Sequence, residues 1–344
     1  MSWLTVTRSG IVVPVRLDPA GVTGPTVGQA RGRTWRSAGP AHRVPSSVDG
    51  SRVQQRIVEA VACLPEGSAA TGWAALAWLA PRWFDGVADD GRTMLPVPVA
   101  VGDRGTARPR KGVTLSEDWL FDDDVLTVDG LPITVPERSV SYEARKARTD
   151  LMAMTHVDMA AFHDLIDLGA LASYADRLGS RPGTLRLRRA IAAGNENAWS
   201  PQEVRLRKLW ADHRPARLLC NAAVFDHAGN HLFTPDVLDP VSGVAGEYDG
   251  DVHAGRERRR HDLGRQESAR GAGIEVVTMI GGHGEDQAFL RRLDAAHDRA
   301  RARTGPRRWT LDQPAWWVDT STVARRRALS GEQAARWLAH RRRT

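Results

Sequence analysis

Cysteine is scarce in this chain of 344 residues: only Cys63 and Cys220 occur, far apart in the sequence. A disulfide framework or a cysteine-rich zinc site needs more thiols at closer spacing. We therefore expect both cysteines to be reduced residues of the protein interior, as is usual in the cytoplasm.

Long hydrophobic runs are also absent. No stretch approaches the ~20 apolar residues that span a bilayer. The first residues, MSWLTVTRSG, lack the positively charged start and apolar core of a signal peptide. The sequence therefore predicts a cytoplasmic protein with no membrane partner.

Lysine is rare, with three residues among the 48 basic ones, which points to a GC-rich genome rather than to a mechanism. The net charge is 48 − 41 = +7 and the pI is about 10.1, which favours a polyanionic partner, most simply nucleic acid. From residue 305 onward nine Arg face three acids, 9 − 3 = +6. This end is expected to be either a nonspecific nucleic-acid contact or a frayed basic terminus. Within it, Ser330 with Gln333 predicts a capping box for the last short helix.

The length suits two or three domains of mixed α/β class, α+β overall. Composition and element patterns divide the chain into an N-terminal unit, an α+β region, a helical connector, an α/β domain and a basic tail, over residues 1–50, 51–147, 148–198, 199–304 and 305–344.

Local patterns predict several elements of the first half. The segments 34–36 and 41–44 predict a β-hairpin, and Asp129-Gly130 predicts a second hairpin turn. The acids 122–124 are expected on a solvated turn, because consecutive acids there do not converge on one metal. Near the first hairpin, the nucleic-acid-binding candidates are Arg31, Arg33 and Arg36, for which solvated surface arginines are the alternative.

The stretch 234–265 concentrates acids where apolar residues would be more stable. Residues 232–238 predict a strand that contains Asp236, 241–244 predict a tight turn, and 245–248 predict the next strand. Asp236 precedes the turn, and Glu247 and Asp249 follow it at alternate positions. Carboxylates on adjacent strands repel one another and lose hydration, and a divalent cation between them removes that cost. From spacing alone, solvated acids beside a turn are the simpler interpretation.

A helix is predicted to start ahead of these acids, with Ser200 as N-cap, Pro201 at its first position and Glu203 in its first turn. Glu203 fits either a capping box or a metal ligand.

Taken together, these motifs resemble the PD-(D/E)XK nuclease signature, in the form found in actinobacterial proteins with a C-terminal domain related to very-short-patch-repair endonucleases. The resemblance spans about 199–303. Its pieces are Ser200-Pro201-Gln202-Glu203, Asn221 to Gly229, Asp236, Glu247 to Gly250, His253, Asp262 to Arg265 and Gly273 to Val277. More weakly, residues 29–45 and 72–75 resemble AbiEi-type antitoxin-like proteins, which implies a winged-helix-like N-terminal unit.

The resemblance implies a restriction-endonuclease-like core with a mixed sheet and a Mg²⁺- or Mn²⁺-dependent endonuclease acting on DNA. Asp236 and Glu247 would hold the metal, with Glu203 and Asp249 as further ligands or water-positioning groups. The resemblance also implies that His253 acts as general acid or base. Arg265 would stabilise charge on the phosphate, and Arg258 would join it in contacting DNA from a basic helix predicted over 256–270. A protein partner in a defence or toxin-antitoxin system is a further expectation.

One position departs from the family pattern: Asp249 stands where the motif has lysine. Either Arg265 or His253 supplies the positive group, or the site uses three carboxylates, or it no longer cleaves. In the last case the chain would be a DNA-binding regulator with a catalytically silent nuclease fold.

Overall fold

The computed structural model describes residues 3–80, 82–88, 90–103, 105–249, 269–282 and 284–341. The chain forms two compact units. One comprises Met1–Ala147 with Ala170–Arg188, and the other Arg148–Gly169 with Arg189–Thr344. Helices combine with mixed sheets, which confirms the predicted α/β class in its coarse form.

The first unit begins with a small antiparallel sheet that confirms the predicted hairpin. Strand β2 (Trp35–Gly39) pairs with β3 (His42–Pro45), and β1 (Val15–Arg16) adds to the other edge of β3. A single 3-10 turn, η1 (Gln29–Arg31), precedes the hairpin.

A five-stranded mixed sheet, in the order β6-β5-β4-β8-β7, forms the rest of this unit with its helices. The strands are β4 (Ala69–Ala70), β5 (Val97–Ala100), β6 (Val113–Ser116), β7 (Val125–Val128) and β8 (Leu131–Thr134). The helices are α1 (Val53–Ala62), α2 (Gly72–Leu79), α3 (Pro136–Lys146), α5 (Leu168–Leu178) and α6 (Thr184–Ala193), of which α5 and α6 each include residues of both units.

The two turns predicted on either side of β7 have different outcomes. Asp129 and Gly130 both have positive φ, 50° and 77°, as the predicted two-residue turn requires. The solvated turn predicted for 122–124 is wrong for Asp124, which is fully buried. Its carboxylate accepts hydrogen bonds from the Tyr174 hydroxyl at 2.9 Å and from the Phe121 amide at 2.8 Å, so a long-range partner replaces water.

The second unit contains a four-stranded sheet in the order β14-β13-β12-β9. Its strands are β9 (Leu219–Cys220), β12 (Val237–Asp239), β13 (Val244–Asp249) and β14 (Glu275–Ile280). Strands β9, β12 and β13 pair antiparallel in turn, whereas β13 and β14 run parallel. The remaining elements are α4 (Asp150–Phe162), α7 (Pro201–His213), β10 (Val224–Phe225), β11 (His231–Phe233), α9 (Glu285–Ala302), α10 (Val323–Arg327) and α11 (Gly331–Arg341).

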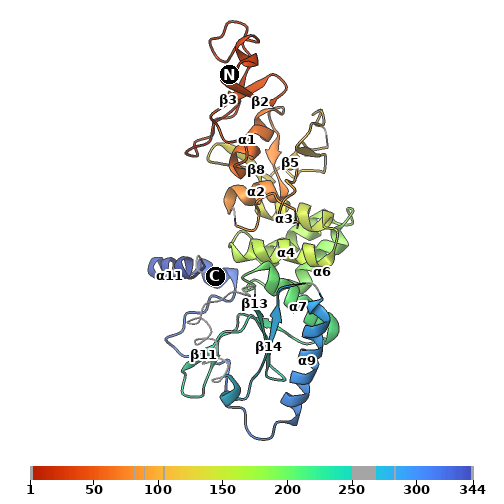
Figure 1. Ribbon diagram of the computed structural model, residues 1–344, viewed down its shortest axis with the longest axis vertical. Coiled ribbons are helices and arrows are strands. Elements are labelled where there is room, and N and C mark those ends of the chain that lie inside the picture. The colour runs from red at the N-terminus through yellow and green to blue at the C-terminus, as the bar shows by residue number, and fades with distance from the viewer. Residues whose placement is uncertain are drawn as a thin grey trace. The chain divides into compact units, whose positions relative to one another are not determined.

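Apolar side chains cover both faces of this sheet, so alternation along β13 sends successive residues into different clusters. Val244 packs with Trp210 of α7 and Phe289 of α9, the helix that lies along β14 in Figure 1. Ala245 packs on the opposite face with Trp309.

Gly246 lets α7 approach this sheet closely. A Cβ built on Gly246 would lie 2.9 Å from Cζ3 of Trp210 and 3.1 Å from Cδ2 of Leu206. Because Gly246 has no side chain, α7 can lie close to β13. This contact fixes how far the amino end of α7 lies from the sheet.

The connection from β11 to β13 corrects one expectation and confirms another. A single strand predicted over 232–238 is wrong, because β11 and β12 are separated at Thr234–Asp236. The predicted turn at 241–244 is confirmed, with Asp239 accepting hydrogen bonds from the Val241 amide at 2.9 Å and the Ser242 hydroxyl at 2.6 Å.

Residues 309–341, here called the C-terminal segment, belong to the second unit. Trp309 is buried, and Thr310 exchanges backbone hydrogen bonds with Phe225 at 2.8 and 3.0 Å. Ser330 and Gln333 form the predicted reciprocal cap at the start of α11.

None of the helices in the described part of the chain has both the length and the apolar character needed to cross a membrane.

Candidate metal centre and adjoining cavity

The amino end of α7 carries the first candidate ligand. Ser200 Oγ accepts a hydrogen bond from the Glu203 amide at 3.2 Å, and Pro201 occupies the first turn. Glu203 Oε2 in turn accepts one from the Trp199 amide at 2.7 Å. The predicted cap is confirmed, and it fixes the buried Glu203 side chain near the start of the helix.

Asn221 links Glu203 to Asp236. Its Nδ2 donates to Glu203 Oε2 and to the Asn197 carbonyl, each at 2.7 Å. Its backbone amide donates to the Asp236 carbonyl at 3.1 Å, which continues the pairing of β9 with β12 by one residue. Asn221 has φ +45°, a left-handed conformation that asparagine tolerates better than most residues.

Register places the remaining acids beside Asp236. Val237 pairs with Gly246, so the same antiparallel register continued by one residue sets Asp236 opposite Glu247. Asp236 Oδ2 also accepts a hydrogen bond from the Tyr248 amide at 2.7 Å. Asp249 lies two residues beyond Glu247 and therefore on the same face of β13. Glu247 is half-buried and Asp249 exposed.

The electrostatics of Glu203 differ from those of a surface cap. Burial, and after it the negative charge of Asp236, raise the pKa of the Glu203 carboxyl from 4.5 to about 8, against the hydrogen bonds that lower it. Glu203 therefore holds a proton at neutral pH unless a cation offsets the charge of the pair.

A buried ion pair fixes α7 from its other side. Arg207 Nη2 donates to Asp158 Oδ2 at 2.7 Å and to the Ala193 carbonyl at 2.9 Å. Asp158 is completely buried, and that burial raises its pKa to about 6 in spite of Arg207. Because α4 supplies Asp158, this pair holds the helix that carries Glu203 against α4.

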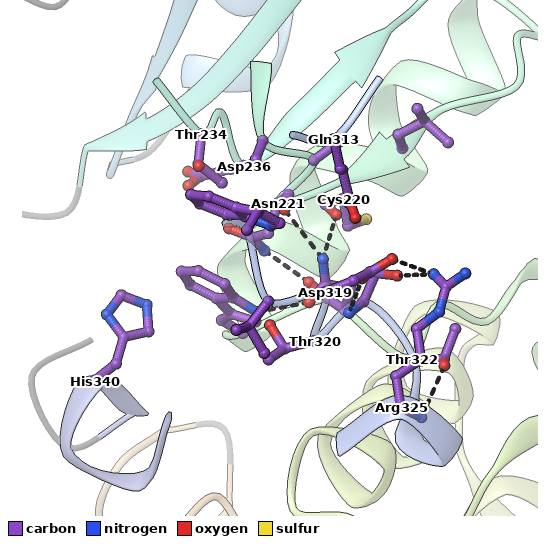
Figure 2. A pocket seen from close by; sticks show the side chains of 18 of the residues that line it. Cys220, Asn221, Thr234, Asp236, Gln313, Asp319, Thr320, Thr322, Arg325 and His340 are labelled. Carbon is purple, nitrogen blue, oxygen red and sulfur yellow. Dashed lines mark hydrogen bonds and ion pairs between the residues drawn. The ribbon is translucent and has the colours of Figure 1, made fainter. Parts of the chain in front are cut away.

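Glu203 and Asp236 line a cavity of about 1400 Å³. Figure 2 shows Asp236 and Thr234 on its strand side, with Asp319 and Arg325 of the C-terminal segment across from them. The charge pattern predicts a basic end for residues 305–344, and the cap at Ser330 predicts a helix within it. The aromatic wall that this end contributes to the cavity is not predicted, and the paired tryptophans at 316–317 are its signal in the sequence.

The terminal arginines are partly internal. Arg341 is buried and donates to Asp164 Oδ2 at 2.8 Å, so the frayed-terminus alternative is wrong for this residue.

The structure distinguishes the three N-terminal candidates for nucleic-acid binding. Arg31 and Arg33 are exposed. Arg36 instead bonds both oxygens of Glu59, at 2.9 and 2.5 Å, as well as the Val48 carbonyl at 3.1 Å, so its guanidinium already holds the hairpin to α1.

Three other candidates, His253, Arg258 and Arg265, lie outside the described residues, as does most of the helix predicted over 256–270. Among the residues that are described, no group of three His, Cys, Asp or Glu side chains is placed to hold a metal ion. The donor type at Glu203, Asp236 and Glu247 nevertheless suits Mg²⁺ or Mn²⁺, which prefer carboxylate oxygens and often use only one or two of them.

Comparison with protein-family models, with curated proteins and with solved structures found no match to this chain.

Both cysteines are free. The interior position predicted for them is confirmed for Cys220, which is buried beside Arg207, whereas Cys63 is half-buried.

Proposed function

We propose that this chain is a Mg²⁺- or Mn²⁺-dependent endonuclease that hydrolyses phosphodiester bonds of DNA in the cytoplasm. The observation that carries the proposal is the placement of Glu203, buried and with a pKa of about 8, beside Asp236 at the wall of a large cavity. A helix cap alone does not need a second carboxylate next to it, and this neighbour costs free energy without a cation.

The order and direction of the strands support a restriction-endonuclease-like core for the second unit. Helix α7 precedes a sheet in which β9, β12 and β13 alternate in direction and β14 runs parallel to β13. We infer a restriction-endonuclease-like core from this order together with the motif resemblance. We also propose the β2–β3 hairpin as the wing of a winged-helix-like unit, with Arg31 and Arg33 contacting DNA.

Each acid has a distinct task in this proposal. Asp236 and Glu247, opposed on adjacent strands, would hold the metal, which when bound polarises the phosphate and activates water. Glu203 would release its proton as the cation neutralises the pair. Asp249 would position water, and His253 and Arg265 keep their predicted roles as proton carrier and phosphate contact.

Cleavage of supercoiled plasmid and of oligonucleotides in Mg²⁺, Mn²⁺ or EDTA tests the activity directly. We expect metal-dependent nicking that Asp236→Ala and Glu247→Ala each reduce at least ~100-fold, since both remove a metal ligand. Asp298→Ala is the matched control, because this acid of the same unit is 71% exposed on α9. Full activity in both Asp236→Ala and Glu247→Ala would rule the proposal out.

A silent DNA-binding regulator is the second candidate, and Asp249 at the lysine position favours it. Calorimetric titration with Mn²⁺ in buffers of different protonation enthalpy separates the two. The nuclease proposal expects binding with release of up to one proton near pH 7, absent in Glu203→Gln. No metal binding, with salt-sensitive DNA binding intact, would favour the regulator. We further propose a protein partner of a defence or toxin-antitoxin system, which affinity capture with tagged protein would test.

A further inference from the structure

The cavity beside Glu203 and Asp236 has a second wall of different chemistry. Trp199, Trp317, Trp337 and His340 line it, and three of these come from the C-terminal segment. Asp319 and Arg325 on this wall form an ion pair with each other, so their charges largely cancel. Arg217 and Arg336 line the cavity as well, so it joins an acidic end to an aromatic side that also carries cationic side chains.

Buried contacts hold this aromatic wall in place. Arg326, 1% exposed, donates to Asp164 Oδ1 at 2.5 Å and to the Ala161 carbonyl at 2.7 Å. The Val323 amide donates to Glu196 Oε2 at 2.7 Å. The segment between Trp317 and Trp337 is thus anchored to α4 and to the chain ahead of α7.

The aromatic rings are arranged in two groups. Trp317 stacks on His231, with ring centroids 5.0 Å apart and planes at 26°. Trp199 meets Trp337 and His340 edge to face, at 5.8 and 4.9 Å. Trp199 and Trp317 are only half-buried, so each retains accessible ring surface in the cavity.

Trp337 supports the second group of rings from within. It is 9% exposed, and its Nε1 is buried without a hydrogen-bond partner among the described residues. Trp337 therefore contributes to the wall by packing against Trp199.

We propose that this cavity takes up one unpaired nucleobase of a DNA strand, stacked against Trp317 and Trp199, with its phosphodiester toward Glu203 and Asp236. This inference rests on the proposed function and names its substrate class: DNA carrying an unstacked nucleotide. A paired base cannot present its faces in this way, because its neighbours in the duplex cover both. Arg217 and Arg336 suit the phosphates that flank such a nucleotide, and the aromatic rings add stacking, which accepts any base.

Fluorescence anisotropy with the full chain in EDTA tests the proposal without cleavage. The probes are a labelled 15-nucleotide single strand, the same strand fully paired, and the duplex with one unpaired nucleotide. We expect the single strand or the interrupted duplex to bind at least tenfold tighter than the paired duplex. Tight binding of the single strand alone assigns the cavity to single strands, and tight binding of both assigns it to an extrahelical base.

Two adjacent tryptophans supply the matched variants. Trp317 lines the cavity, whereas Trp316 is 60% exposed and does not. Trp317→Ala should weaken binding of the preferred probe about 5- to 100-fold and leave the paired duplex unchanged, while Trp316→Ala alters neither. A 2-aminopurine at the unpaired position should be quenched by wild type and by Trp316→Ala only.

Equal affinity for all three probes, or equal losses in Trp316→Ala and Trp317→Ala, would overturn the inference. Because these measurements do not depend on cleavage, an inactive protein that still prefers unpaired DNA would contradict the nuclease proposal while supporting the base site. An active nuclease that shows no preference for unpaired DNA would support the nuclease proposal and contradict the base site.

Discussion

Glu203 caps α7 through Oε2 and lies beside Asp236 in a buried position. These two features have opposite effects on the protonation of the Glu203 carboxyl. The hydrogen bonds from Trp199 and Asn221 favour the charged carboxylate, whereas burial and the second acid favour the neutral form and prevail. A residue chosen for capping alone would gain nothing from this environment, since an exposed glutamate caps equally well.

The raised pKa predicts how the stability of the second unit depends on pH. The folded-state pKa of about 8 exceeds the ordinary 4.5, so the bound proton stabilises the fold fully below pH 4.5, and this stabilisation is lost as pH rises through 8. Glu203→Gln, which keeps an acceptor oxygen, should match wild type near pH 4.5 and exceed it by on the order of 2–4 kcal/mol at pH 8. Denaturant unfolding at both pH values measures the difference.

Asp298→Asn is the control for this experiment, because Asp298 is exposed and its removal should shift stability equally at both pH values. If Glu203→Gln is no more stable than wild type at pH 8 without divalent metal, the proposed protonation of Glu203 is wrong.

At the scale of elements, the contact between α7 and β13 determines where Glu203 lies. Gly246 permits that contact, because any Cβ there would press on Trp210 and Leu206. The helix is simultaneously held by the Arg207–Asp158 pair, so it cannot shift outward without disturbing a buried charge.

Gly246→Ala should therefore destabilise the second unit by about 1–3 kcal/mol through overpacking, and should reduce metal-dependent activity by displacing α7. Gly271→Ala is the matched substitution, since a Cβ there would meet no atom of the described residues within 4 Å in a helical stretch, and alanine should be neutral or stabilising. Thermal unfolding of both variants measures the contrast. Equal melting temperatures for the two would show that the α7–β13 contact tolerates a methyl group.

At the scale of the whole molecule, the C-terminal segment returns to elements far earlier in the chain. Arg326 contacts Asp164 across 162 positions of sequence, and Arg341 contacts the same carboxylate across 177. Asp164 itself has φ +59°, a conformation available mainly to Asp, Asn and Gly among common residues. One carboxylate therefore secures both α10 and α11.

Arg326→Ala should release the segment and cost about 2–3 kcal/mol, because it leaves buried acceptors unpaired. Limited proteolysis should then cut within 310–330 several times faster than in wild type. Arg327→Ala is the control: this neighbour is 47% exposed, pairs with Asp167 at 3.2 Å and donates to the Asp164 carbonyl at 2.9 Å, so loss of its exposed contacts should change proteolysis far less than loss of the buried Arg326. Identical cleavage of the two variants would mean that other contacts hold the segment.

The sequence alone determined the features that depend on a few neighbouring residues. The Ser200–Glu203 cap, the Asp129-Gly130 turn and the alternation of Val244 to Asp249 are local consequences of hydrogen-bonding capacity, backbone freedom and strand geometry. The same local logic failed at Asp124, because Tyr174 lies 50 residues away and no turn pattern records it.

The solvation of the acids and the residues that face them depend on long-range packing, which no local pattern records. Glu203 and Asp236 meet because α7, β9 and β12 pack together through Asn221, and their burial, rather than their spacing, sets the pKa of Glu203. Residues 309–341 look in sequence like a basic end, yet in the fold they form the aromatic wall of the cavity. Charge and composition are sums over a segment, whereas desolvation and stacking depend on which distant residues that segment contacts.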